Sequence, residues 1–143
     1  MTLILQMKYL RTIVAVFFIA AVFTNCSNDK HYPKAEDALD AGRQFIDACL
    51  KGDFDKAAYY MTNDEKNQSL LLEQKRNYET KGRQEQSEYN DASIIIHEDA
   101  TVNDTTHIIN YENSYDKTGR KVKVVLRDGT WQVDFKYTFD GNL

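Results

Sequence analysis

The sequence predicts an α+β domain in which the helices come first and a four-stranded antiparallel sheet follows. Apolar residues recur at three- and four-residue spacing between residues 35 and 50, as on one face of a helix. They alternate with polar residues between residues 130 and 139, as in a strand with one buried face. The dipeptide Asp128-Gly129 precedes this alternating run and is typical of a tight hairpin turn.

The composition is that of one folded domain. The chain has 143 residues, of which 42% are apolar and 28% charged, and this argues against a disordered or low-complexity chain. A formal charge of −4 without a basic block argues against nucleic-acid binding. Two cysteines are too few for a disulfide scaffold.

The amino-terminal residues have the parts of an export signal. An uncharged apolar run over residues 12–23 follows Lys8 and Arg11. This run is shorter than the ~20 residues of a spanning helix, so we interpret residues 1–25 as a signal peptide. Translation could begin at Met1 or at Met7, and the second start gives a cleaner signal.

The signal ends at Val22-Phe23-Thr24-Asn25-Cys26, which resembles the lipobox of bacterial lipoproteins. The resemblance implies that Cys26 is acylated and anchors the protein in a membrane, and the Ser27 that follows favours the outer membrane. The mature chain would carry 16 basic and 22 acidic residues, a charge of −6, so the acyl chains would have to supply the attachment. Residues 26–34 are expected to be a tether. A plain secretory signal with a coincidental cysteine is the alternative.

Three helical segments are expected after the tether. The first runs from Ala35 to Leu50 and ends at Lys51-Gly52. Asp53 can cap a second, short helix that carries Phe54, Ala57, Ala58 and Met61 on one face. A third begins at Thr62 or Asn63 and stops near Gly82, and the polar residues 73–88 are expected to be a solvated helix end and connector.

Four strands are expected over residues 89–98, 106–115, 120–126 and 130–139, with a loop over 99–105. A two-residue turn at Asp128-Gly129 pairs Leu126 with Trp131, Val124 with Val133, and Val122 with Phe135. A loop over residues 116–119 would pair Tyr111 with Val124 and Ile109 with Leu126. One face of the sheet is therefore apolar and should lie against the first helix. The reverse face carries Ile95, Ile108 and Val125, which are either the floor of a weak homodimer contact or scattered surface residues.

The segments Lys51-Gly52-Asp53-Phe54 and Asp128-Gly129-Thr130-Trp131-Gln132-Val133, with Phe45-Ile46 in the opening helix, resemble small envelope lipoproteins of the cystatin-like, nuclear transport factor 2-like superfamily. The resemblance covers roughly residues 35–139 of the expected domain, 35–143. It implies a curved sheet wrapped around a long helix, forming a cone with a pocket at its wide end. It indicates the fold more than the function.

Catalytic residues are not evident. By strand parity the acids Glu112, Asp134 and Asp140 fall on the polar face, and we expect them to be solvated. A bulge in the first or second strand could still turn Asp91 or His107 inward. His97 and His107, with Glu98, Asp99 and Asp104 nearby, are ligand types for zinc or copper, but without ligand spacing we expect no metal site. Cys49 lies on the inward stripe of the first helix and is expected to be a buried thiol.

Tyrosine and tryptophan remain as candidates for a binding site. The candidate pocket residues are Tyr59, Tyr111, Tyr115, Trp131 and Tyr137, which would suit a ligand with an apolar face and hydroxyls, although they could equally be core aromatics. The sequence thus favours a lipid-anchored, non-enzymatic module that binds a small ligand or a protein partner, with no cofactor. The alternatives are an enzyme of the same fold, such as an isomerase, dehydratase or hydrolase, and a structural or inhibitory lipoprotein.

Overall fold

The computed structural model describes residues 30–140, of which the segment from Tyr32 onward belongs to one compact unit. The predicted signal peptide, Cys26 and most of the predicted tether lie outside the described residues. Within the described range the fold is α+β, with four α-helices followed by a four-stranded antiparallel sheet in the order β1-β2-β3-β4. The predicted fold class is confirmed at this level.

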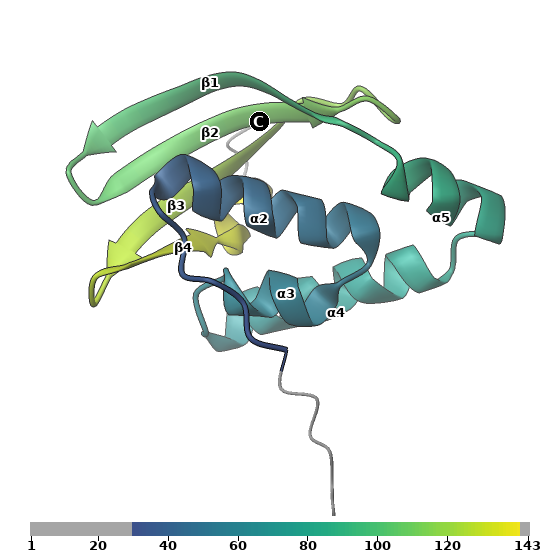
Figure 1. Cartoon of the computed structure of the whole chain (residues 1–143), viewed down its shortest axis with the longest axis horizontal. Helices are drawn as coiled ribbons and strands as arrows, with labels where there is room; N and C mark the ends of the chain where they lie inside the picture. The colour runs from purple at the N-terminus through teal and green to yellow at the C-terminus, as the bar shows by residue number, and fades with distance from the viewer. Residues whose placement is uncertain (1–29, 141–143) are drawn as a thin grey trace, which may run out of the picture. The chain divides into compact units, whose positions relative to one another are not determined.

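Helix α2 (Ala38–Lys51) lies across one face of the sheet. In the view of Figure 1, helices α3 (Phe54–Tyr59) and α4 (Glu65–Glu79) lie below α2, and strands β1 and β2 of the sheet lie above it. Helix α2 begins three residues later than predicted because Asp37 is extended and its side chain accepts a hydrogen bond from the Asp40 N–H at 2.7 Å. Gly52, with a φ of 70°, ends the helix in the left-handed conformation, as the sequence predicts.

Three further helices follow: α3 (Phe54–Tyr59), α4 (Glu65–Glu79) and α5 (Arg83–Asn90). The predicted Asp53 cap of α3 is confirmed, whereas α4 is capped by Asp64 and not by Thr62 or Asn63. The prediction of a connector within residues 73–88 is wrong, because most of the second half of this segment forms the separate helix α5. No residue of α5 is buried, so no apolar periodicity marks this helix in the sequence.

The strands are β1 (Ile94–Asn103), β2 (Thr106–Asn113), β3 (Arg120–Arg127) and β4 (Thr130–Asp134). The first strand begins five residues later than predicted, and the loop predicted over 99–105 is wrong because β1 continues to Asn103. The turn between β1 and β2 is only two residues long. The Asn103 side chain closes it by accepting a hydrogen bond from the Thr105 N–H at 2.9 Å, without a glycine.

The register of the last hairpin is confirmed in part. Leu126 pairs with Trp131 and Val124 with Val133, as predicted. The predicted pair Val122–Phe135 does not form, since β4 ends at Asp134 and residues Phe135–Phe139 form the 3₁₀ helix η1.

The predicted register of β2 on β3 is wrong by four residues. Ile109 pairs with Val122 and not with Leu126, and Tyr111 pairs with Arg120 and not with Val124. The loop between the two strands is accordingly longer than predicted, spanning residues 114–119. A shift by an even number leaves each side chain on its predicted face.

The strand predicted over residues 130–139 ends early because side chains take over its hydrogen bonds. The Lys136 N–H donates to the Asn67 Oδ1 at 2.7 Å. The Thr138 hydroxyl donates to the Lys121 carbonyl of β3 at 2.7 Å. If β4 were longer, one of its backbone N–H groups would donate to this carbonyl instead.

The apolar face of the sheet packs against α2 and forms the core, as predicted. Its sheet members are fully or almost fully buried: Ile109, Tyr111, Val122, Val124 and Val133. From α2 it takes a helical stripe that includes Ala41, Phe45, Ile46 and Ala48. Burial of these side chains is the main stabilising contribution to the domain.

The outer edge of β4 is covered by the segment after α3. Met61 lies parallel to Val133, whose N–H donates to the Tyr60 carbonyl at 2.8 Å and whose carbonyl accepts from the Thr62 N–H at 2.9 Å. The end of the predicted tether is also held, because the Tyr60 hydroxyl donates to the Pro33 carbonyl at 2.6 Å. The chain is therefore packed against the domain from about Tyr32 onward.

The reverse face of the sheet carries the three apolar residues considered for a dimer contact. Ile108 and Val125 are half-buried and Ile95 is exposed. Ile95 lies opposite Glu112, four residues along β2 from Ile108. Polar residues therefore interrupt the patch, and the homodimer stays a prediction.

Candidate functional site

A cleft of about 390 Å³ opens at the end of the domain where α2, α4 and α5 approach the β2–β3 hairpin and η1. This volume is in the range of small-molecule sites. Its walls come from elements far apart in the sequence. It is lined by Phe45, Ile46, Cys49, Leu50, Gln74, Asn77, Lys81, Tyr89, Tyr111, Asn113, Thr118, Gly119, Arg120, Phe135, Thr138 and Phe139.

The floor of the cleft is a chain of aromatic rings. The Phe45 and Phe135 ring centroids are 4.9 Å apart, and those of Phe135 and Phe139 are 5.1 Å apart, both in edge-to-face arrangements. Phe45 and Phe135 are buried, whereas Phe139 is 54% exposed. The apolar surface thus continues from the core to solvent, which is what an apolar ligand group needs.

The β2–β3 loop forms one rim of the cleft, and Asn113 fixes its shape. The buried Asn113 Oδ1 accepts hydrogen bonds from the N–H groups of Tyr115 and Asp116, each at 3.0 Å. Asp116 in turn accepts from the Thr118 N–H at 2.9 Å. These local bonds fix the conformation of the loop.

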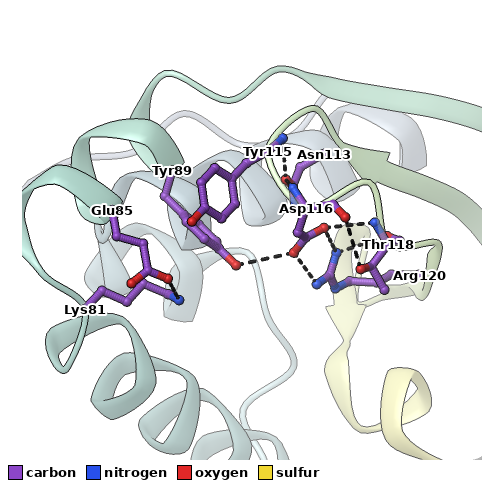
Figure 2. Close-up of polar contacts among 8 residues, drawn as sticks. All are labelled: Lys81, Glu85, Tyr89, Asn113, Tyr115, Asp116, Thr118 and Arg120. Atoms are coloured by element: carbon purple, nitrogen blue, oxygen red, sulfur yellow. Dashed lines mark hydrogen bonds and ion pairs between the residues drawn. The ribbon is translucent and has the colours of Figure 1, made fainter.

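Asp116 and Arg120 form a two-bond ion pair in this loop (Figure 2). Arg120 Nη1 lies 3.0 Å from Asp116 Oδ1, and Nη2 lies 2.7 Å from Oδ2. The hydrogen bonds from Arg120 hold the pKa of Asp116 well below its usual range, although partial burial opposes the shift. Both groups are charged at neutral pH.

Helix α5 and Lys81, which lies two residues before it, form the opposite rim. Lys81 Nζ lies 2.6 Å from Glu85 Oε1 and 4.5 Å from the centre of the Tyr89 ring. The Tyr89 hydroxyl donates to Asp116 Oδ2 at 3.3 Å, so Tyr89 joins the two rims, as Figure 2 shows. The bond to Glu85 raises the pKa of Lys81, which keeps the ammonium charged.

The remaining titratable groups in the cleft are neutral at physiological pH. Burial raises the pKa of the Cys49 thiol to about 12. Burial also raises the pKa of the Tyr111 hydroxyl above its usual value. Neither group is a base or a nucleophile at pH 7, and no carboxylate or imidazole of residues 30–140 is among the lining residues.

The five tyrosine and tryptophan residues proposed from the sequence do not come together. Tyr111 lines the cleft, and Tyr115 packs beside it on the rim, its ring 4.6 Å from that of Tyr89. The other three lie elsewhere: Tyr59 against Tyr32 and Tyr60, Trp131 against His107, and Tyr137 beneath Lys123. Cys26, the predicted site of lipid attachment, lies outside the described residues.

The acids predicted on the polar face behave differently from one another. Glu112 is half-buried beside His97, with Oε2 3.3 Å from the ring nitrogen Nε2. The prediction that Asp134 is solvated is wrong, since its residue is 3% exposed. The side chains of Asn67, Lys123 and Lys136 surround its carboxylate. Parity assigned Asp134 to a face but could not show that α4 covers that part of it.

The histidines have separate partners. His97 pairs with Glu112, and His107 Nδ1 lies 2.9 Å from Asp99 Oδ1. Among residues 30–140 no group of three or more histidine, cysteine, aspartate or glutamate side chains is placed to hold a metal ion.

The sequence interpretation missed the polar residues of the rim, although two signals were present. Lys81, Glu85 and Tyr89 recur at intervals of four, the spacing of one helix face. Asp116 and Arg120 flank a turn of Lys, Thr and Gly, where a carboxylate can organise the loop and pair across it. The first signal was hidden because residues 73–88 were interpreted as a connector, and the second because residues 116–119 were treated only as a loop that joins two strands.

Within residues 30–140, no helix is both long and apolar enough to cross a membrane. No family model matches the sequence, and no curated protein matches it. The function proposed below therefore rests on the residues and their geometry.

Proposed function

We propose that the protein is a lipid-anchored cell-envelope protein whose folded domain binds a small molecule in the cleft, without catalysing a reaction. The observation that carries the binding function is the cleft itself, with its aromatic floor and its fixed polar rims. A few placed polar groups around an apolar concavity are the usual composition of a ligand site. Binding of a protein partner at the same rim is the related alternative.

The finer fold assignment, a cystatin-like or nuclear transport factor 2-like cone, is part of this proposal. It is supported by the position of α2 across the apolar face of the sheet and by a cleft at one end of that helix. In such a cone the wide end is where a ligand would enter, and Phe139 and the β2–β3 loop lie at the mouth of this cleft.

Binding is favoured over catalysis by the groups in the cleft. General acid–base chemistry needs a side chain that changes protonation near pH 7. Cys49, Lys81, Tyr89 and Tyr111 all have pKa values raised above their ordinary values, which are already well above neutral. An isomerase, dehydratase or hydrolase that uses acid–base chemistry would need a side chain in the cleft that changes protonation near pH 7.

The anchoring part of the proposal predicts the behaviour of a Cys26→Ser variant. Acyl chains contribute about 0.8 kcal/mol for each buried CH₂ group, so the wild-type mature protein should partition into the detergent phase. Cys26→Ser should either appear in the aqueous phase or remain an unprocessed precursor, as seen on immunoblots after phase separation. An identical aqueous form of both proteins would contradict the lipid anchor.

The binding part predicts that filling the cleft abolishes uptake of an apolar fluorescent probe. N-phenylnaphthylamine, a neutral aromatic dye, should bind the full chain with enhanced emission. Gln74→Trp on the α4 wall should weaken this binding at least about tenfold, because the indole occupies the space of the probe. Glu73→Trp is the matched control, one residue away on the same helix, exposed and outside the lining. Equal binding to both variants would contradict the cleft as the site.

A further inference from the structure

We propose that the ligand of the cleft is an amphipathic anion, a free molecule with an apolar body and one carboxylate, sulfonate or phosphate head. This inference rests on the proposed binding function and narrows it to a ligand class. The apolar body would lie on the rings of Phe45, Phe135 and Phe139, and the head would lie between Lys81 and Arg120.

The charged residues of the lining all have the same sign. Lys81 and Arg120 are the charged side chains among the lining residues within the described range, and no acid is among them. Their partners Glu85 and Asp116 are not part of the lining. Two cations therefore line the cleft of a mature chain whose formal charge would be −6, and each is paired with a carboxylate outside the lining. An anionic head can bind beside these cations, whereas the net negative charge of the chain disfavours anions elsewhere.

Arg120 keeps donors for a further acceptor. Its Nη1 donates to Asp116 and to the Thr118 carbonyl, and its Nη2 donates once to Asp116. A guanidinium has five N–H groups in a fixed plane. The Nε–H and the second Nη2–H donate to no residue in the range 30–140, and two such parallel donors match a carboxylate or sulfonate.

The guanidinium is also prepositioned. Asp116 holds it on one side, and Asp116 is itself held by the loop N–H of Thr118 and by the Tyr89 hydroxyl. Lys81 is held from the other rim by Glu85 and the Tyr89 ring. Fixing these long side chains before binding removes much of the entropy cost that a mobile cation would incur.

The test compares two dyes that differ in charge. Anilinonaphthalene sulfonate and N-phenylnaphthylamine share the same aromatic body, but only the first carries an anionic head. We expect Arg120→Gln to weaken the sulfonate about tenfold, the effect of one charge-assisted hydrogen-bonded pair, and to change the neutral dye by less than about twofold. Lys81→Gln should weaken the sulfonate about threefold with the same selectivity.

Matched controls separate the head-group effect from loss of structure. Lys51→Gln likewise breaks a cation–carboxylate pair four residues apart, with Lys51 Nζ 2.7 Å from Asp47 Oδ1. Lys51 does not line the cleft, so this variant should leave the binding of both dyes unchanged. Arg120→Lys keeps the charge and should recover part of the sulfonate affinity. Circular dichroism of each full-length variant shows whether the fold is retained.

The Asp116→Asn variant is expected to change the affinity for the sulfonate dye in the opposite direction. This change removes the negative charge that competes for Arg120, while the amide oxygen of asparagine can still accept from the Thr118 N–H and from Arg120 Nη1, so the guanidinium stays in position. The sulfonate dye should then bind about threefold more tightly and the neutral dye as before. Weakened sulfonate binding in a folded Asp116→Asn variant would overturn the proposal.

The outcomes distinguish this inference from the binding function. If neither dye binds, or Gln74→Trp has no effect, the binding function fails. If both dyes bind in the cleft and respond equally to Arg120→Gln, the binding function stands and the anionic class is wrong. Monomeric decanoate should displace the sulfonate dye, and phosphatidylglycerol vesicles should not. Displacement by vesicles alone would overturn the free ligand in favour of a bilayer headgroup.

Discussion

Replacing Asn67 by alanine is expected to lower the free energy of unfolding by about 3 kcal/mol, because this side chain connects three segments in a buried site. Asn67 has no exposed surface. Its Nδ2 donates to Asp134 Oδ1 at 3.2 Å, to Asp64 Oδ2 at 2.7 Å and to the Thr62 hydroxyl. Its Oδ1 accepts from the Lys136 N–H at 2.7 Å. Alanine would leave the Lys136 N–H without its acceptor and would remove one of the donors to the Asp134 carboxylate.

The charges around Asn67 enlarge this effect. Burial alone raises the pKa of Asp134, but hydrogen bonds from Lys123, Lys136 and Asn67 bring it below its usual value, so the carboxylate is ionised in the folded protein. The hydrogen bond from Lys136 lowers the pKa of Asp64 to about 2. An ionised group in a buried site is costly when it loses a donor.

Urea unfolding at pH 7 measures the change, with Ser69→Ala as the control. Ser69 lies two residues away on the same helix and is exposed, so its loss should alter stability by less than about 0.5 kcal/mol. A second variant, Asn67→Asp, keeps the shape of the side chain but faces Asp64 and Asp134 with a third carboxylate, and should be at least as destabilised. A loss below about 1 kcal/mol for Asn67→Ala would show that the network contributes little.

The Gly42→Val variant is expected to lose about 3 kcal/mol of stability, because α2 packs directly against the sheet at this glycine. A Cβ atom built at Gly42 would overlap Ile109 Cδ1 and lie 3.5 Å from Val124 Cγ2. Ile109 and Val124 are fully buried, so neither can move aside without disturbing the core. Valine has a higher helix propensity than glycine, but this gain is smaller than the cost of the overlap with the core.

Gly82→Ala is the matched control for this substitution. A Cβ at Gly82 would meet no atom within 4 Å, and its backbone conformation is one that alanine adopts. Thermal unfolding of the full chain should therefore show a lowered midpoint for Gly42→Val and a change of at most about 0.5 kcal/mol for Gly82→Ala. Similar stability of the two variants would mean that α2 can move away from the sheet without a large cost.

The sequence by itself determined the class of the fold, the faces of the sheet and several element ends. Asp53 and Gly52 act at helix ends as their chemistry requires, and Asp128-Gly129 sets the last hairpin. The side chains of Ile109, Val122, Val124 and Val133 are buried on the face that alternation predicts. These features depend on neighbours within a few residues, which a sequence pattern records directly.

The end of β4 shows where local patterns become ambiguous. Phe135 and Phe139 are four residues apart, so they would share a face in a strand, and in the η1 helix their ring centroids still lie 5.1 Å apart. The alternation therefore could not distinguish a strand from the η1 helix. The deciding contact comes from Asn67, 69 residues before Lys136 in the sequence. Its side chain accepts a hydrogen bond from the Lys136 N–H, which a longer strand would use for pairing.

The cleft was decided by the tertiary structure alone. Lys81 and Tyr89 come from the region of α5, whereas Asp116 and Arg120 come from the β2–β3 hairpin, and the Tyr89–Asp116 bond spans 27 residues. The five residues chosen from the sequence are all aromatic side chains with a polar atom, but only Tyr111 lines the cleft. Strand parity fixes the face of a side chain and not its distance along the sheet or the helix that covers it. These two quantities depend on the register and on helix packing, which involve residues far apart in the chain.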